Sequence, residues 1–229
     1  VCEATWYVHD PEGVSEASAA AYFFARKIYA ALEVPVGIIN VSWGGTPIEA
    51  WMSKELLETE FAGEFDLSRY ETREWPEKNP NPYQYPGVLY NGMLYSLKNY
   101  TVKGFIWYQG CANVKVNPVS YKETLTGLIL SWRKEFNNPE MPFYIAQIAP
   151  HTYEDLQGAQ LRESQAYVAA RVPGCALVVT NDSQEIPGDI HPRLKKNVFH
   201  RFALCALGQH YKKDVGPWRS PEFSRVEAT

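Results

Sequence analysis

The sequence contains few cysteines, no long apolar run and no concentration of charge of one sign. Its cysteines number four and none forms a Cys-x-x-Cys pair, so neither a zinc ribbon nor a thioredoxin-type site is indicated. The longest apolar runs, at 34–41 and 175–180, have the length of a strand and fall far below the roughly 20 residues of a membrane-spanning helix. A net charge of −4 at pH 7, without a Lys/Arg cluster, argues against nucleic acid or an anionic membrane as the main partner.

What the sequence does contain is an alternation of short apolar segments and helical patterns along its 229 residues. Hydrophobic residues make up 45% and charged residues 21% of the chain, which is typical of globular proteins, and the length suits one large domain. Buried strands are expected at 34–41, 102–108, 141–148 and 175–180. Helices are expected at 15–32 with Ser15 as the cap, 48–57, 91–100, 121–136, 160–170 and 192–211, and a surface loop at 70–86. This alternation predicts an α/β fold with a mainly parallel sheet.

Polar turns follow three of the expected strands. They are the glycine-rich turn at 42–47, the Gln-Gly-Cys-Ala-Asn turn at 109–113, and the segment from Asn181 to His191. Ligands of doubly wound sheets bind beyond the carboxyl ends of the strands. We therefore expect these turns to converge at one edge of the sheet.

The last of these segments contains the best candidate for a general base, His191. A carboxylate is needed to fix the tautomer of such an imidazole, and either Asp189, two residues earlier, or Asp182 is placed to supply it. Taken alone, an Asp-x-His pattern is more often a capping aspartate beside a surface histidine. The Asn113 amide and the Gly45 backbone N–H are candidate donors to a developing oxyanion, and together these parts match an acyl-transfer site.

A nucleophile is absent from this set of residues. There is no Gly-x-Ser-x-Gly turn, and the Trp-Gly-Gly neighbours of Ser42 indicate a turn that presents backbone amides instead. Cys111 is the alternative nucleophile, provided that a base lowers its pKa, although a buried and inert thiol is the more common state.

Five segments carry a resemblance to a known family: INVSWGGTPIEAWM, LYNGM, KGFIWYQGCAN, LRESQ and DIHPRLKKNVFHRFALCAL. In this order, from about Tyr22 to Tyr211, the chain resembles the sialate O-acetylesterase group of the SGNH (GDSL-like) hydrolases. The resemblance implies a three-layer α/β/α, flavodoxin-like fold over residues 1–212. Residues 213–229 would then be a tail that leads to a following segment.

The resemblance also implies hydrolysis of O-acetyl esters on sugars, sialic acid or another glycan, by a Ser-His-Asp mechanism without a metal or organic cofactor. By position, Gly45 and Asn113 match the family's two oxyanion-hole blocks. His191 matches the catalytic histidine, and Asp189 is our choice for its acidic partner. Substrate contacts are expected from Trp43, Tyr108, Gln109 and Arg162. Because relatives that act on glycans are usually exported, we expect a secreted, periplasmic or lysosomal location.

The chain departs from the family pattern in two places. Cys111 stands where the family has an acid after WYQG, and the family block with the nucleophilic serine lies upstream of the first helix. In the flavodoxin-like strand order that block is an interior strand, so we expect an upstream segment, a separate N-terminal chain or a homo-oligomer to complete the sheet. Two rival hypotheses stay open: a carbohydrate-binding relative without catalysis, and an acyl hydrolase that uses Cys111.

Overall fold

A parallel sheet lies at the centre of the protein. In this computed structural model the described residues are 5–8, 10–72, 81–153, 155–186, 188–191, 193–222 and 224–227. The three strands are β1 (Phe105–Trp107), β2 (Phe143–Ala146) and β3 (Cys175–Val178), in the order β1-β2-β3. Every residue of the central strand β2 is buried. Burial on both faces is what a parallel sheet covered by helices requires.

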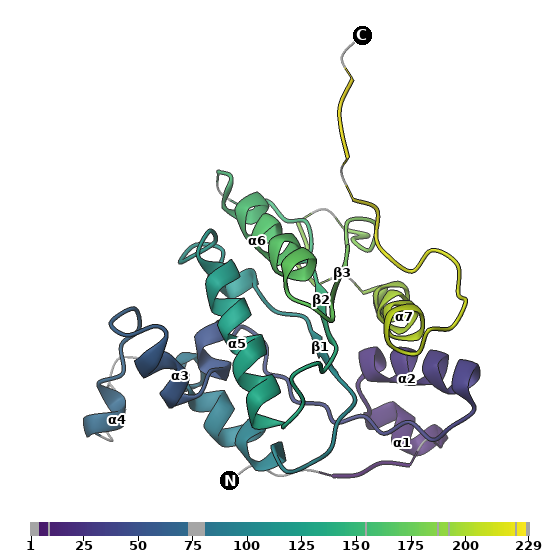
Figure 1. The fold of residues 1–229 in the computed structure, drawn as a ribbon, viewed down its shortest axis with the longest axis horizontal. Helices are drawn as coiled ribbons and strands as arrows, with labels where there is room; N and C mark the ends of the chain where they lie inside the picture. Colours follow the sequence, from purple (N-terminus) through teal and green to yellow (C-terminus); the bar gives the residue numbers. More distant parts are fainter. Residues whose placement is uncertain are drawn as a thin grey trace.

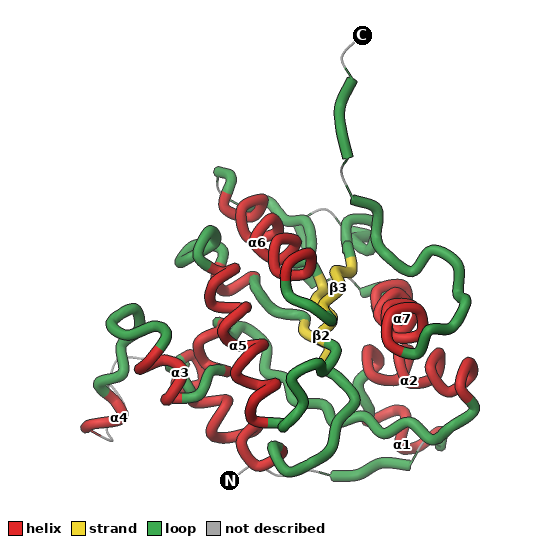
Figure 2. Tube along the Cα trace, in the orientation of Figure 1, coloured by secondary structure: helices red, strands yellow, loops and turns green. Residues whose placement is uncertain are grey.

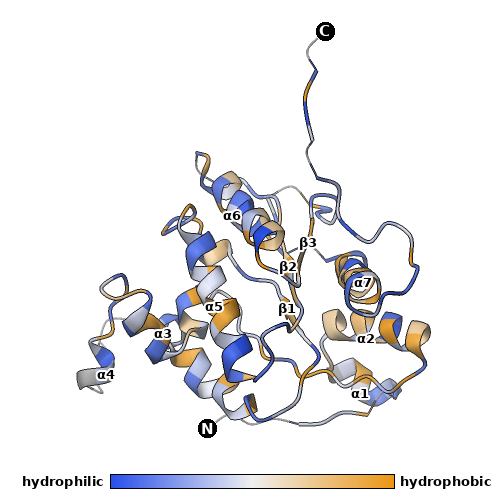
Figure 3. Cartoon of the chain, viewed as in Figure 1, coloured by the Kyte–Doolittle hydropathy of each residue, from blue (hydrophilic) through white to orange (hydrophobic). Residues whose placement is uncertain are grey.

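Two layers of helices cover the sheet (Figure 1). On one side lie α5 (Tyr121–Glu135) and α6 (Gln157–Arg171), and on the other lie α2 (Ala19–Leu32) and α7 (Lys195–Cys205). Alternate residues of β2 enter two separate cores: Phe143 and Ile145 pack on the α5–α6 side, whereas Tyr144 and Ala146 pack on the α2–α7 side. Figure 3 accordingly colours the strands and much of α2 as hydrophobic. The expected α/β fold is confirmed.

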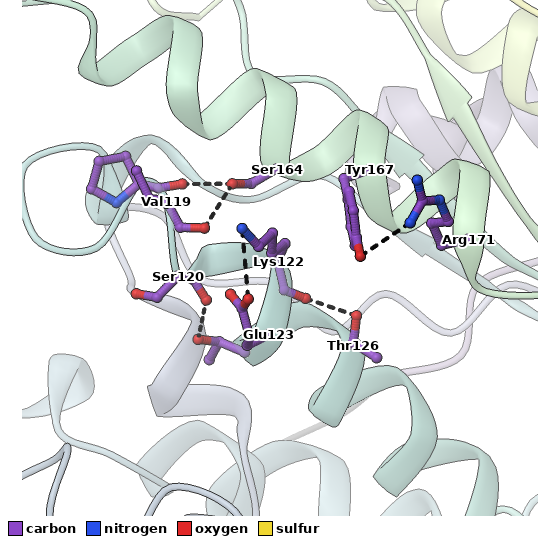
Figure 4. A network of polar contacts seen from close by, with 10 residues as sticks. Val119, Ser120, Lys122, Glu123, Thr126, Ser164, Tyr167 and Arg171 are labelled. Carbon is purple, nitrogen blue, oxygen red and sulfur yellow. Dashed lines mark hydrogen bonds and ion pairs between the residues drawn. The ribbon is translucent and has the colours of Figure 1, made fainter.

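The helices α5 and α6 are joined by polar contacts as well as by the core (Figure 4). The Ser164 hydroxyl of α6 donates to the carbonyls of Pro118 and Val119, at 2.7 and 3.2 Å, just before α5 begins. The Tyr167 ring lies near two cations, Lys122 of α5 and Arg171 of α6. These contacts hold the segment that leads from the end of β1 into α5.

The expected helix at 15–32 is wrong at its start, because two helices occupy this region. Asp10 accepts the Gly13 N–H and Pro11 stands at the first helical position, so α1 (Pro11–Glu16) begins earlier than expected. The cap of α2 is Ser18 rather than Ser15. The other long helices follow expectation closely, although α7 begins at Lys195 and continues as a π-helical turn, η6 (Ala206–His210).

The expected helices at 48–57 and 91–100 are also wrong as continuous α-helices. The first is a 3-10 turn, η1 (Ile48–Trp51), followed by α3 (Lys54–Thr59), which Ser53 caps. The second is a π-helical turn, η3 (Tyr90–Leu94), followed by the 3-10 turn η4 (Tyr95–Leu97). The expected loop contains α4 (Arg69–Thr72) and η2 (Pro82–Gln84), and its residues 73–80 lie outside the described part.

The expected buried strand at 34–41 is the clearest error. This segment pairs with none of the described strands, and Figure 2 draws it as a loop below the sheet. Val34 and Ile39, expected to be buried, are 48% and 37% exposed. A strand exists only where another strand accepts its backbone hydrogen bonds, and β1 is an edge strand of the sheet. The apolar composition of 34–41 is typical of a strand, but none of the described strands pairs with this segment.

The beginning of the tail packs on the sheet instead of leaving it. The Ser220 hydroxyl donates to the Leu177 carbonyl at 3.2 Å and accepts the Val179 N–H at 3.1 Å, beside β3. The Cys205 thiol donates to the Trp218 carbonyl at 3.4 Å. The expected domain boundary after residue 212 stays a prediction. No helix in the described part of the chain is both long and apolar enough to span a bilayer.

Candidate active site

The turn at 42–47 presents the Gly45 backbone to solvent. Gly45 has φ of +71°, a conformation that favours glycine, and open space surrounds the position of a Cβ. The Thr46 hydroxyl donates to the Trp43 carbonyl at 2.8 Å, and the Trp51 indole N–H donates to that hydroxyl at 3.0 Å. None of the described residues accepts a hydrogen bond from the Gly45 N–H, so this group is available to a ligand.

Asn113 follows β1 in the 3-10 turn η5 (Cys111–Asn113) and is completely buried. The turn depends on Gly110, which has φ of +146° and where a Cβ would meet the side chains of Ile148 and Leu161 at 2.8 and 2.9 Å. The Oδ1 atom of Asn113 accepts the Ile48 N–H at 2.9 Å. This bond joins the turn after β1 to the turn at 42–47.

The Asn113 amide nitrogen has two acceptors within the protein. It donates to Glu49 Oε2 at 3.0 Å and to Asn117 Oδ1 at 3.1 Å. Burial raises the pKa of the Glu49 carboxyl, against the opposing effect of the hydrogen bond from Asn113. Sequence reasoning missed the contact of Glu49 with Asn113. The signal was its place inside the WGGTPIEAW motif, where a charged residue interrupts an otherwise apolar turn.

Gln109 is a bridge between the two turns. Its Nε2 donates to the Thr46 carbonyl at 3.0 Å and to Asn113 Oδ1 at 2.7 Å. Its Oε1 accepts the Tyr121 hydroxyl at 2.7 Å, and its own carbonyl accepts Gln165 Nε2 at 3.0 Å. The side chain expected to contact substrate is therefore held by α5, Asn113 and the glycine turn, and its backbone is held by α6. Gln109 is thus hydrogen-bonded both to Asn113 and to Thr46, the residue after Gly45, and we call Gly45, Gln109 and Asn113 the amide cluster.

A hollow of about 330 Å³ lies beside the amide cluster. Glu49 lines it, as do Ala112 and Val116 on either side of Asn113 in sequence. The remaining lining residues come from the first turn and from the region around α4 and η2: Pro47, Asp66, Gln84, Tyr85 and Pro86. Gln84 also donates to the Gly45 carbonyl at 2.8 Å. This hollow is large enough for part of a sugar.

The three other expected substrate contacts are spread around the site. Trp43 is 51% exposed, and its ring centroid lies 5.5 Å from that of Tyr83. Tyr108 packs in the α2–α7 core with the Lys195 ammonium 5.4 Å from its ring centroid, and burial raises the pKa of its hydroxyl to about 12. Arg162 of α6 donates to Gln147 at 2.9 Å and also to Asn181.

His191 and Asp189 lie in the segment between β3 and α7. The Asp189 carboxylate accepts the His191 backbone N–H at 2.8 Å, and the Nδ1 atom of the imidazole is 3.7 Å from the same oxygen. The side chain of His191 is 82% exposed. Asp189 thus caps its own turn. Its carboxylate is also in contact with the His191 imidazole. Pro187 and Pro192 lie outside the described residues.

Asp182, the alternative acid, is engaged elsewhere. It forms a bidentate pair with Arg201 of α7, with distances of 2.7 and 2.5 Å, and this pairing lowers the pKa of its carboxyl. An aspartate held by a guanidinium has little capacity left to orient an imidazole. Asp189 is therefore the better supported of the two.

Cys111 is half-buried, and burial raises the pKa of its thiol. The Tyr153 hydroxyl donates to its sulfur at 3.4 Å. A nucleophilic cysteine needs the opposite, a lowered pKa next to a base. Across the described ranges, no three His, Cys, Asp or Glu side chains gather as metal ligands would.

The structure thus brings Gly45, Gln109 and Asn113 together, and it pairs His191 with Asp189. Among the described residues no hydrogen bond or ion pair joins these two groups. Both follow carboxyl ends of strands, since Asn113 comes after β1 and His191 after β3. Their catalytic roles stay predictions.

The fold places this protein in the class of α/β proteins with a parallel sheet. Proteins of this class bind ligands beyond the carboxyl ends of their strands, where the polar turns lie here. The chain belongs to the carbohydrate esterase family described as sialic acid-specific acetylesterase, whose sequence pattern matches residues 7–202. This confirms the resemblance found in the motifs.

The relatives include sialate O-acetylesterases. The chain is 32% identical to that of Homo sapiens over 228 residues, covering 92% of this chain and 42% of the relative. It is 26% identical to that of Mus musculus, covering 92% of this chain and 46% of the relative. A crystal structure of a carbohydrate acetylesterase from Xanthomonas citri is similar with a TM-score of 0.73 and 35% identity, over 86% of this chain and 42% of that one. The chain therefore spans less than half the length of these relatives.

Proposed function

We propose that this chain is part of a carbohydrate O-acetylesterase that removes acetyl groups from sugar hydroxyls. The observation that carries the proposal is the amide cluster, in a chain of the carbohydrate esterase family. The exposed N–H of Gly45 and the amide of Asn113 lie on two adjoining turns, linked by Gln109. Donors fixed before the substrate arrives are the largest single source of stabilisation for a tetrahedral oxyanion.

In the proposed reaction a serine hydroxyl attacks the acetyl carbonyl while His191 takes its proton. The tetrahedral oxyanion receives hydrogen bonds from the Gly45 N–H and from Asn113 Nδ2. One of the two present acceptors of Asn113, Glu49 or Asn117, must give up its bond at this step. His191 then protonates the departing sugar oxygen. Water hydrolyses the acetyl-serine through the same sequence of proton transfers and releases acetate.

The serine of this proposal comes from a strand upstream of Val1. Two observations support such a strand: β1 is an edge strand among the described strands, and the apolar segment 34–41 pairs with none of them. A strand inserted between them would satisfy both sets of backbone groups and would make the sheet flavodoxin-like. The two-layered covering of helices would then continue over this added strand.

The test uses the gene with its upstream region. Acetate release from an aryl acetate and from an O-acetylated sugar is measured for the wild type and for His191→Ala. Release by the wild type that disappears in the variant supports the proposal. Equal release by both proteins contradicts it.

Two variants test which aspartate is the acid of the proposed triad. Asp189→Asn keeps an acceptor for the His191 N–H but removes the carboxylate, so we expect kcat to fall by about 10²-fold or more. Asp182→Asn, the matched control, loosens the pair with Arg201 and should change kcat little. The reverse pattern, measured by acetate release, would transfer the acid role to Asp182.

A carbohydrate-binding relative without catalysis is the second candidate. The exposed imidazole of His191 and the absence of an acid at position 111 favour it. It predicts sugar binding that survives His191→Ala together with no acetate release from the complete protein. By the family resemblance we also propose an exported location, either secreted, periplasmic or lysosomal, which fractionation of the native source tests.

A further inference from the structure

Every polar atom of the Gln109 side chain is bound within the protein. Its amide nitrogen donates to the Thr46 carbonyl at 3.0 Å and to Asn113 Oδ1 at 2.7 Å. Its Oε1 accepts the Tyr121 hydroxyl at 2.7 Å. A side-chain amide has two hydrogens to donate, so neither is left for a sugar. A role other than substrate binding fits these contacts better.

Groups that can only donate or only accept fix the direction in which Gln109 is held. The Trp107 indole N–H can only donate, and it lies 3.2 Å from the Tyr121 hydroxyl oxygen, which accepts it. The hydrogen of the completely buried Tyr121 hydroxyl then goes to Gln109, to Oε1 at 2.7 Å or to the backbone carbonyl at 3.4 Å. On the other side, the Thr46 carbonyl can only accept. Gln109 is therefore held with its oxygen toward Tyr121 and its nitrogen toward Asn113.

The direction of Gln109 in turn sets that of the Asn113 amide. Asn113 Oδ1 faces two donors, Gln109 Nε2 at 2.7 Å and the Ile48 N–H at 2.9 Å. A reversed amide would place its nitrogen against these donors and its oxygen against the oxygens of Glu49 and Asn117. Only the observed direction presents N–H groups to a developing oxyanion, and an amide oxygen in their place would repel it.

We propose that Gln109 and Tyr121 are positioning residues, which do not touch the sugar but hold the Asn113 amide with its nitrogen toward the reacting oxygen. The inference rests on the proposed function and deepens it, because it says what keeps the oxyanion donor in place before substrate arrives. It also gives the side chains of Trp107 and Gln109 in the WYQG segment a shared task, since the hydrogen-bonded chain that ends at Asn113 begins at Trp107.

The first test is Gln109→Glu in the protein with its upstream region. This variant keeps an oxygen for the Tyr121 hydroxyl but places a second oxygen against Asn113 Oδ1. We expect kcat for an aryl acetate to fall about 10²-fold while KM stays within about twofold. Protonation of the new carboxyl restores one donor toward Asn113, so the ratio of variant to wild-type kcat should rise as the pH falls from about 8 to about 5. A ratio that does not change with pH, or an increase in KM alone, would overturn the inference.

The second test is Tyr121→Phe, which removes the hydroxyl behind Gln109. We expect kcat to fall about tenfold with little change in KM. In the Asn113→Ala background the same substitution should change kcat less than about twofold, because Tyr121 acts through Asn113. Tyr144→Phe is the matched control: this tyrosine is also buried, but in the α2–α7 core, and its hydroxyl has no hydrogen-bond partner among the described residues. Equal losses from Tyr121→Phe in both backgrounds would reduce its role to general stability and overturn the inference.

Crystal structures of the complete wild-type protein and of Gln109→Glu provide a measurement that needs no turnover. We expect the variant to show Asn113 displaced, with its bond to the Ile48 N–H lengthened or lost. An Asn113 side chain that keeps all its wild-type contacts in the variant would overturn the inference. A wild type that releases acetate from no ester would reject the proposed function, while the crystal structures would still decide the positioning. The two failures are thus distinguishable.

Discussion

The two halves of the candidate site differ in how firmly the chain holds them. Asn113 is completely buried and is fixed from several directions, by the Ile48 N–H, Gln109 and Glu49. His191 is 82% exposed, and its imidazole approaches a single described carboxylate at 3.7 Å. The donor half is built into the core after β1, whereas the base half stands on a surface segment after β3.

This difference indicates where the free energy for organising the site comes from. A buried amide held by its neighbours needs little reordering when charge develops on the substrate, because Asn113 exchanges only its bond to Glu49 or to Asn117. An exposed imidazole loses side-chain entropy when it is positioned, so it gains its geometry from whatever packs against it later. In the proposed enzyme that partner is the added strand with its serine, together with the bound sugar.

The variant with the largest expected effect removes the base. In the protein with its upstream region, His191→Ala should lower kcat/KM for an aryl acetate by at least about 10⁴-fold, because no other group would take the serine proton. Since the side chain is exposed, the melting temperature should stay within a degree or two of wild type. A large loss of stability would show that the protein holds His191 as firmly as Asn113. It would contradict the difference between the two halves.

Asn113→Ala should affect both activity and stability. Losing one oxyanion donor costs about 10²- to 10³-fold in kcat. The Ile48 N–H and the Gln109 amide would also lose their acceptor inside the core, which lowers the free energy of unfolding by about 2 kcal/mol or more. Urea denaturation and acetate release measure the two effects. Asn117→Ala, which removes only the second acceptor of the Asn113 amide, is the control and should change both much less.

Glu49→Gln tests the donor half through pH. Burial raises the pKa of the Glu49 carboxyl above its ordinary value of 4.5, so folding favours the protonated form. Its contribution to stability is therefore fully present below pH 4.5 and is lost as the pH rises through the folded-state pKa. Glutamine can still accept from Asn113, so the variant should lack this fall in stability.

Unfolding free energies between pH 4 and 8 check this expectation. The exposed Glu64 supplies the control variant, Glu64→Gln, which should keep the wild-type profile. Identical profiles for Glu49→Gln and the wild type would mean that this carboxyl is not desolvated by folding.

The sequence predicted the donor half better than the base half for a physical reason. Gly45, Gln109 and Asn113 occupy turns directly after apolar segments, and hydrogen bonds of the Asn113 and Gln109 side chains join the two turns. The position of His191 depends on a segment of irregular backbone between β3 and α7, which no periodicity describes. Likewise, the strand expected at 34–41 has the right composition, yet a strand also needs a neighbour, and composition says nothing about which neighbour is present. The hydrogen bond that Glu49 accepts from Asn113 joins residues that are far apart in sequence, so only the structure shows it.

Cys111→Ser should have the smallest effect of all. The thiol lies within the donor half in sequence, between Gln109 and Asn113, but burial raises its pKa, and a serine hydroxyl can accept the Tyr153 O–H in its place. We expect acetate release within about threefold of wild type and an unfolding free energy within about 1 kcal/mol. Treatment with iodoacetamide should leave acetate release intact, because burial raises the pKa of the half-buried Cys111 thiol, and the other described cysteines, Cys175 and Cys205, are buried. Inactivation of the wild type but not of Cys111→Ser would make the thiol the nucleophile, and the site would then need no strand or serine from outside this chain.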